Sequence, residues 1–130
     1  MLERARKAQY APRTLRRVPI PSFAEHYVVD TGEGVSVAHE LRSAIDWRQI
    51  NLTNAAEVKS VGEVDVILCR NVLIYFRDDL TRRVVDALAA QLRPLGALFV
   101  GVSESVTRLG TALACEERGG VFVYRKQAAS

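Results

Sequence analysis

The sequence has few of the residues that bind metals or cross-link chains. Its 130 residues include two cysteines, Cys69 and Cys115, and two histidines, His26 and His39. These four are spaced too widely for the close ligand pairs of a zinc site, so we predict no metal ion. The first ten residues are polar and charged and lack the apolar core of a secretory signal. Because disulfides belong mainly to secreted chains, we expect free cysteines and a cytoplasmic location.

Long apolar runs are also missing. No window approaches the about 18 uncharged apolar residues that a membrane-spanning helix requires, so membrane insertion is not expected. Positive charge is concentrated at the start, where six basic residues accompany one acid: Arg4, Arg6, Lys7, Arg13, Arg16 and Arg17 against Glu3. Such a patch suits nucleic acid or an acidic protein, or is a solvated helix face. Aromatic residues that would stack on bases are not interleaved with it, which argues against nucleic acid as a partner.

The first part of the sequence predicts short elements. Residues 2–9 are expected to form a helix, and residues 13–18 a further helical turn. The β-prone runs YVVD and VSVA flank a glycine-containing loop, which predicts a hairpin within residues 27–38. HELRSA, residues 39–44, is expected to be a connector or a helical turn. IDWRQINL, residues 45–52, alternates apolar and polar side chains as a strand would.

The second part predicts an α/β arrangement. VDVILC, residues 64–69, is apolar apart from Asp65, and such a run is typical of a strand covered on both faces. A helix with one apolar stripe follows, capped by Asp78 or Asp79, and ALFVGVS, residues 97–103, predicts a second buried strand. Strand, helix and strand in succession form a βαβ unit with parallel strands. Residues 114–126 surround a Gly-Gly pair and predict a closing antiparallel hairpin.

Polar residues follow the predicted strands at the edge where ligands bind. In parallel α/β sheets, ligands lie just beyond the carboxyl ends of the strands. Residues 69–72 follow the first strand of the βαβ unit, residues 103–105 follow the second, and Asn51 ends the strand predicted upstream. We therefore expect these three polar groups to converge on one rim, although topology alone does not name their ligand.

Two motifs resemble the C-terminal part of the CheR-type chemotaxis receptor methyltransferases. They are VDVILCRNVLIYF and LRPLGALFVGVSES, which depart from the family pattern at Val64, where phenylalanine is usual, and at Leu95, where glycine is usual. Upstream, RARKAQY and QINL are also similar to family segments. The resemblance implies a partial class I methyltransferase (Rossmann-like) sheet over residues 45–125, with a small inserted β-subdomain at about residues 27–44.

The same resemblance implies methyl transfer from S-adenosylmethionine (SAM) to glutamate side chains of chemotaxis receptors. The implied partners are the cytoplasmic helices of the receptors or their C-terminal tail. A glutamate carboxylate, with an ordinary pKa of about 4.3, is already ionised at neutral pH and needs no general base. Catalysis would then consist mostly of holding the carboxylate oxygen in line with the methyl group.

The resemblance also assigns site residues. Asn51 and Leu52 would contact the adenine end of the cofactor, and the segment from Cys69 to Val72 its methionine end. Tyr75 would lie near the methyl group, and Arg70 would attract the acidic receptor segment. The residues implied for cofactor binding are Asn51, Leu52, Cys69, Arg70, Asn71 and Val72, and those implied for catalysis are Tyr75 and Arg70.

Each assignment has a structural alternative. Tyr75 could be a half-buried core aromatic, and Arg70 could be an ion-pair partner of Asp78 or Glu104. Asn71 could only form a turn, and Asn51 could only end a strand. Ser103 and Glu104 are expected to stabilise the rim, and Cys69, without a nearby histidine in sequence, is not expected to act as a nucleophile.

Two cofactor-binding features of the family are absent from these 130 residues. No glycine-rich turn joins a strand to a helix, because the one G-x-G, Gly32 to Gly34, lies in the predicted hairpin loop. No acidic residue follows a second strand to hold a ribose, and the family's N-terminal helical domain is missing too. The chain is then either a fragment or a natural short relative. We expect it to bind SAM weakly or not at all by itself, and leave open whether it is an enzyme part or a module that binds receptors or signalling partners.

Overall fold

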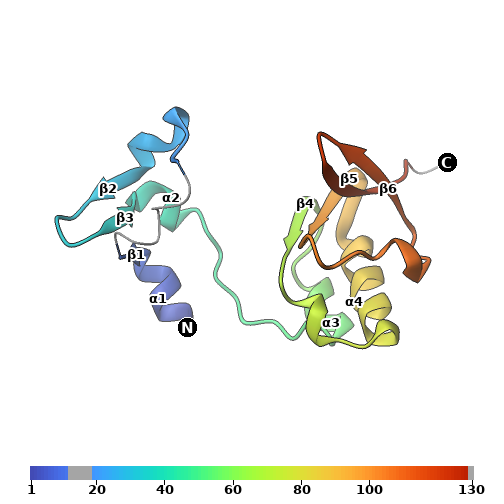
Figure 1. The fold of residues 1–130 in the computed structure, drawn as a ribbon. Coiled ribbons are helices and arrows are strands. Elements are labelled where there is room, and N and C mark those ends of the chain that lie inside the picture. The colour runs from blue at the N-terminus through green and yellow to red at the C-terminus, as the bar shows by residue number, and fades with distance from the viewer. Residues whose placement is uncertain (12–18, 129–130) are drawn as a thin grey trace. The chain divides into compact units, whose positions relative to one another are not determined.

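A computed structural model describes residues 1–11 and 19–128. The chain divides into two compact units, Met1–Gln49 and Ile50–Ser130, and Figure 1 labels helices and strands of each. The helical turn predicted at residues 13–18 lies outside the described residues. The basic residues that this segment contributes to the N-terminal patch lie outside them too. Each unit is described by itself below.

The first unit is a small antiparallel sheet with short helices. Its elements are α1 (Leu2–Lys7), β1 (Gln9–Tyr10), η2 (Ser22–Tyr27), β2 (Val28–Asp30), β3 (Val35–Val37) and α2 (His39–Ser43). The hairpin of β2 and β3 confirms the sequence prediction, and the side chain of Asp30 accepts a hydrogen bond of 2.8 Å from the amide of Gly32 in its turn. β1 adds a third strand, giving the order β1-β3-β2. The predicted helix is shorter than expected because the chain turns at Ala8, whose φ is 47°.

The strand predicted at residues 45–52 is wrong. Residues 45–50 have no regular structure, and among the described residues no strand pairs with them. Alternating polarity does not suffice for a strand, because the hydrogen bonds that stabilise it come from a neighbouring strand. Asn51, expected to end this strand, instead opens a turn in which its carbonyl accepts a hydrogen bond of 2.9 Å from the amide of Asn54.

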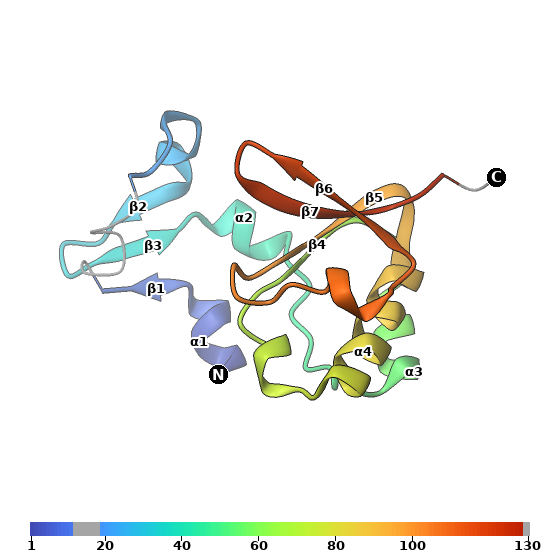
Figure 2. The same ribbon diagram turned by 45° about the vertical axis from the view of Figure 1, so that its right-hand side comes forward.

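The second unit is an α/β body that confirms the predicted fold class. Its elements are α3 (Ala55–Lys59), β4 (Val64–Cys69), η3 (Leu73–Tyr75), α4 (Asp78–Gln91), β5 (Leu92–Val100), η4 (Thr107–Leu109), β6 (Leu113–Arg118) and β7 (Val121–Lys126). The sheet order is β4-β5-β7-β6, with β4 and β5 parallel and the β6–β7 hairpin antiparallel. Figure 2 shows the hairpin extending the sheet and α4 lying across it.

The core lies between α4 and the sheet. Val84, Val85 and Leu88 from α4 pack against Leu98 of β5 and Tyr124 of β7, and all five are buried. Each such aliphatic side chain contributes about 1.5–3 kcal/mol relative to exposure. The Tyr124 hydroxyl keeps a partner in this apolar setting, because it accepts a hydrogen bond of 3.1 Å from the amide of Val106.

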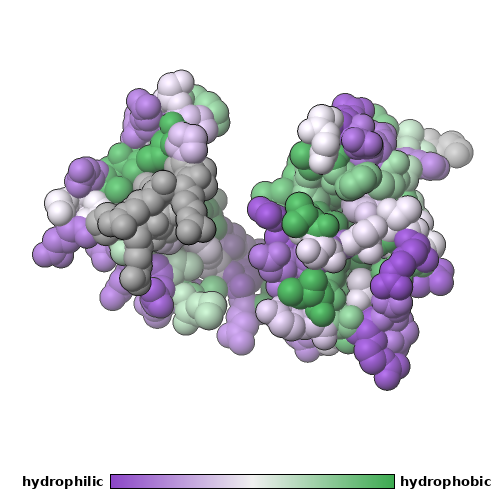
Figure 3. Space-filling view, viewed as in Figure 1, coloured by the Kyte–Doolittle hydropathy of each residue, from purple (hydrophilic) through white to green (hydrophobic). Residues whose placement is uncertain are grey.

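β4 is buried on one face only, which corrects the prediction that both faces are covered. Val66 is 54% exposed and Leu68 is 73% exposed, whereas Cys69 is buried. Within the described sheet β4 is an edge strand, so its apolar run exceeds what this unit itself covers. Figure 3 shows hydrophobic surface on the side of the unit where β4 and η3 lie.

The ends of α4 also differ from expectation. Arg77 occupies the N-cap position and makes no side-chain cap, while Asp78 and Asp79 lie in the first turn. Their negative charges interact favourably with the positive end of the helix dipole, and neither side chain caps the helix. The helix ends at Gln91, before Pro94, because a residue that precedes proline is disfavoured in helical conformation. Lys126 then donates a hydrogen bond of 2.6 Å to the carbonyl of Leu92, where β5 begins.

Candidate functional site

The candidate site is the edge at which β4 and β5 end together. Cys69 lies opposite Val100 in the parallel register, so both strands leave the sheet at the same level. Beyond β4 the chain turns sharply at Asn71, whose φ of 58° is uncommon for a residue other than glycine. Beyond β5 it continues through the buried Gly101 to Glu104. Two of the three polar groups expected at this rim are therefore brought together.

Glu104 joins these two strand ends through its carboxylate. The side chain is only 5% exposed, and four backbone amides donate to it. Those of Asn71 and Val72 lie at 2.7 and 2.8 Å, and those of Gly101 and Ile74 at 2.8 and 3.3 Å. The prediction that Glu104 stabilises the rim is confirmed. The backbone amides just after β4 consequently face inward, toward this carboxylate.

The pKa values of Glu104 and Cys69 follow from this arrangement. Burial of Glu104 opposes its ionisation, but the hydrogen bonds from the four amides outweigh burial and hold its pKa below the ordinary value of 4.5. Burial, and secondarily the negative charge of Glu104, raises the pKa of the Cys69 thiol. Cys69 is therefore a protonated thiol at neutral pH, in keeping with the expectation that it is not a nucleophile.

Arg70 and Tyr75 point away from the body of the unit. Tyr75 is 79% exposed, which rules out the alternative of a half-buried core aromatic. Arg70 is also exposed, and within the described part of the chain it makes no hydrogen bond or ion pair. The ion-pair alternatives for Arg70 are wrong, because Asp78 pairs with Arg108 at 2.8 Å and Glu104 is occupied by backbone amides.

Apolar residues of the same segment anchor it. Leu73 is buried and belongs to the core, and Val72 and Phe76 pack partly against it. Ile74, which lies between them in the sequence, is instead about half exposed. The difference arises because residues 73–75 form a turn of 3-10 helix, which presents neighbouring side chains in three directions.

Asn51 and Leu52 lie in the same unit, in the turn that precedes α3. The Asn51 side chain accepts hydrogen bonds from the amide of Thr53 at 3.0 Å and from its hydroxyl at 2.8 Å. The backbone amide of Asn51 donates a hydrogen bond of 2.9 Å to the carboxylate of Glu57. Leu52 packs partly against the core. Among the described residues no hydrogen bond joins Asn51 to the segment that follows β4.

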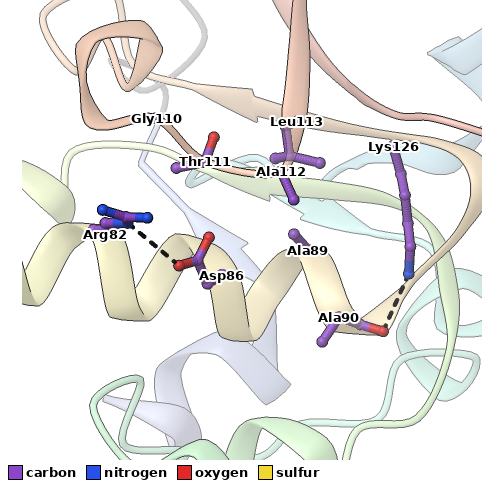
Figure 4. A pocket seen from close by; sticks show the side chains of 9 residues that line it. All are labelled: Arg82, Asp86, Ala89, Ala90, Gly110, Thr111, Ala112, Leu113 and Lys126. Carbon is purple, nitrogen blue, oxygen red and sulfur yellow. Dashed lines mark hydrogen bonds and ion pairs between the residues drawn. The ribbon is translucent and has the colours of Figure 1, made fainter.

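Hollows in the second unit lie on both sides of the rim. One of about 270 Å³ is lined by Glu104, Ser103 and Ile74, and one of about 320 Å³ by Gly101, Phe122 and Tyr124. A larger hollow of about 500 Å³ lies between α4 and the segment leading into β6, where Figure 4 shows Arg82 facing Asp86. It contains none of the residues that follow β4, so we do not assign it to the candidate site.

The described residues were also searched for other features. Within residues 1–11 and 19–128, no group of three histidine, cysteine or acidic side chains is placed to hold a metal ion. No helix in that part of the chain is long and apolar enough to cross a bilayer.

The second unit has the α/β architecture of Rossmann-like proteins, and the candidate site lies at the edge where its two parallel strands end. A solved structure of an O-methyltransferase family protein from Burkholderia thailandensis superposes with a TM-score of 0.50 at 18% identity, over 71% of this chain and 38% of that one. This likeness supports the fold. The family described as "CheR methyltransferase, SAM binding domain" matches residues 1–118, and the chain belongs to that family. The resemblance seen in the sequence is thereby confirmed, and the family description gives SAM as the cofactor.

Characterised relatives are chemotaxis methyltransferases. Chemotaxis protein methyltransferase 2 of Vibrio cholerae is 34% identical over 111 residues, which are 85% of this chain and 38% of the relative. Chemotaxis protein methyltransferase 2 of Pseudomonas aeruginosa is 37% identical over 108 residues, which are 81% of this chain and 38% of that protein. The chain thus spans well under half the length of these relatives.

The residues at the rim fit the cationic end of SAM. The amides that follow β4 donate to Glu104, so the groups that remain are the side-chain amide of Asn71 and the exposed ring of Tyr75. An oxygen acceptor and an aromatic face suit an ammonium and a sulfonium. Sequence reasoning placed Glu104 at the rim but did not find its partners. The sequence feature that marks Glu104 is an acidic residue that follows a glycine at a strand end. The contacts of Glu104 can be seen only in the folded chain.

Proposed function

We propose that the chain is the part of a CheR-like enzyme that presents SAM and the receptor glutamate to each other during methyl transfer. The observation that carries the proposal is the exposure of Arg70 and Tyr75 on a segment that Glu104 fixes to the sheet. Two large polar side chains that have no hydrogen-bond or ion-pair partner among the described residues, in a family of SAM-binding domains, are available to meet substrate. The implied substrate is a glutamate side chain of a chemotaxis receptor.

The residues would act by binding and orientation. SAM, when bound, supplies an electrophilic methyl group on a sulfonium. Asn71, with Cys69 and Val72 beside it, would hold the methionine end, and Asn51 with Leu52 the adenine end. The guanidinium of Arg70 would attract the ionised carboxylate, and the Tyr75 hydroxyl would donate a hydrogen bond that orients it. No residue has to remove a proton, because the substrate carboxylate is already ionised.

A segment exchange tests this function. The matched segment of the Vibrio cholerae relative is replaced by the corresponding residues of this chain, which gives a protein called here the exchange protein. We expect it to methylate a receptor cytoplasmic fragment from the same organism. By calorimetry we expect it to bind SAM at least about 100-fold more tightly than the 130-residue chain, a difference of about 2.7 kcal/mol. Equal affinities would contradict the view that the rim is half of a site, and absence of methylation would contradict the proposed activity.

A second candidate function is receptor docking through the first unit. β2 lies at the edge of the sheet β1-β3-β2, with its outer side unpaired among the described residues and Val29 exposed. Such an edge can accept an extended peptide as a further strand. An extended receptor tail is therefore expected to shift the amide NMR signals of residues 28–30. The same peptide N-methylated at alternate residues, which removes the pairing amides, is expected to shift none. Equal shifts by both peptides would exclude strand addition.

A further inference from the structure

We propose that Glu104 is a positioning residue for methyl transfer, which acts by fixing the segment that carries Arg70 and Tyr75. The expected effect on methyl transfer rests on the proposed function, whereas the geometry around Glu104 does not depend on it. Glu104 itself is buried, so we do not expect it to touch the substrate. Its effect would pass through the backbone of residues 71–74, to which it is bonded.

The carboxylate divides its four hydrogen bonds evenly between its two oxygens. Oε2 accepts from Asn71 and Gly101, and thereby joins the end of β4 to the end of β5. Oε1 accepts from Val72 and Ile74, and thereby holds the turn that follows. Hydrogen bonds to an ionised acceptor are stronger than neutral ones, so this one side chain fixes the geometry of both loops.

The turn has the form of an anion-binding loop filled by the protein's own carboxylate. Asn71 adopts a left-handed conformation, and its own amide and those of Val72 and Ile74 point to one centre, much as in backbone nests that bind phosphates. Here Glu104 occupies that centre. The turn therefore needs no external anion, and the next turn follows from it through the hydrogen bond of 3.2 Å from the Tyr75 amide to the Val72 carbonyl.

Arg70 and Tyr75 depend on this backbone for their placement. Their side chains are exposed and make no hydrogen bond or ion pair with other described residues. The backbone segment between Cys69 and Phe76 is thus what sets their positions, and Leu73 with the carboxylate of Glu104 anchors it. Loss of the carboxylate would leave Leu73 in the core but release the turn on either side.

The carboxylate must be ionised for this arrangement to persist. Burial opposes ionisation of Glu104, but the four amide hydrogen bonds outweigh it, so its pKa lies below 4.5. The stabilisation is fully present above that ordinary value and is lost as the pH falls through the lower folded-state pKa. The other titratable and charged groups nearby are the Cys69 thiol and the Asp78–Arg108 pair, which lines the same hollow.

Amide NMR on the 130-residue chain tests the geometry. We expect the amide signals of Asn71, Val72, Ile74 and Gly101 to titrate together, with one pKa that lies below the ordinary pKa of a glutamate. In Glu104→Gln we expect this titration to vanish and the amide order parameters of residues 70–76 to fall from about 0.85 toward 0.6. The matched control is Glu117→Gln, an exposed glutamate on β6 that should change neither. Different titration midpoints for the four amides would overturn the proposal. This titration is measured on the unsubstituted chain, so it does not depend on the folding of a variant.

Kinetics of the exchange protein test the positioning role. At a temperature where the variant is folded, we expect Glu104→Gln to lower kcat per folded molecule about 10-fold or more, since small misplacements are costly in oriented reactions. The KM for SAM should change less than kcat. An unchanged kcat per folded molecule, with only a lower Tm, would show a purely structural role and overturn the proposal. If even the unsubstituted exchange protein were inactive, the proposed function would fail, while the amide measurements would still decide whether Glu104 holds the turn.

Discussion

Replacing Tyr75 with phenylalanine is expected to lower the kcat of methyl transfer by the exchange protein about 100-fold. This is the typical cost of removing one hydrogen-bond donor that orients or stabilises the reacting group. Because Tyr75 is 79% exposed and its hydroxyl has no partner among the described residues, the free energy of unfolding should change by less than about 0.5 kcal/mol. Initial rates with labelled SAM and a receptor fragment, together with urea unfolding, measure both quantities.

The matched control for this variant is Tyr10→Phe. Tyr10 is also exposed, lies in the first unit and has no assigned role in transfer, so its rate should stay within a factor of two or so of the original. If Tyr75→Phe retained full kcat, the exposed hydroxyl would not orient the carboxylate. Any role of Tyr75 would then belong to its aromatic ring, and Tyr75→Leu, which removes the ring, would test that role.

Replacing Gly101 with alanine is expected to destabilise the second unit by about 3 kcal/mol. An added Cβ would meet the Oε2 atom of Glu104 in hard contact, and Asn71 Oδ1 at 3.0 Å. A glutamate end can usually move aside, but this one is held by four amides. Moving it would leave buried donors unsatisfied, at about 1–3 kcal/mol each. Amide hydrogen exchange in β5 and β7 measures the loss.

A second glycine separates this explanation from ordinary glycine effects. Gly62 has a φ of 84°, so alanine there is strained, but nothing lies within 4 Å of an added Cβ. Its replacement should cost about 1–2 kcal/mol. Backbone conformation alone predicts the larger loss at Gly62, whereas the carboxylate contact predicts the larger loss at Gly101. The rank order of the two variants decides between them.

Sequence patterns predicted most of the second unit. The bounds of β4 were correct to the residue, because its apolar run ends at a sharp change to polar residues after Cys69. The helix, the parallel strand and the closing hairpin followed from periodicity and from the Gly119–Gly120 turn. The bounds of the parallel strand were wrong, because β5 spans Leu92–Val100 and not residues 97–103. The motif CRNVLIYF and its companion also predicted the family correctly.

Two kinds of error have physical causes. The strand expected at residues 45–52 is absent because periodicity carries no information on whether a pairing partner is available. The prediction that β4 is buried on both faces was wrong. A run such as VDVIL indicates that a strand requires burial, but it does not show that the same unit provides it, and within this unit Val66 and Leu68 are exposed. Three of the four amides that donate to Glu104 lie 30 to 33 residues away in sequence, so only the register of β4 on β5 brings them to it. The roles of Arg70, Asn51 and the other site residues remain predictions.

The most direct test of the central claim is the chemical form of the methyl group that the exchange protein transfers. The claim predicts that label from SAM appears on receptor glutamates as an ester, which dilute alkali releases as volatile methanol. It also predicts that Arg70→Ala lowers this labelling, because a cation that attracts the carboxylate is lost, while Arg77→Ala, an exposed arginine close by, does not. Label that is stable to alkali, or no label with a folded exchange protein, would contradict the account.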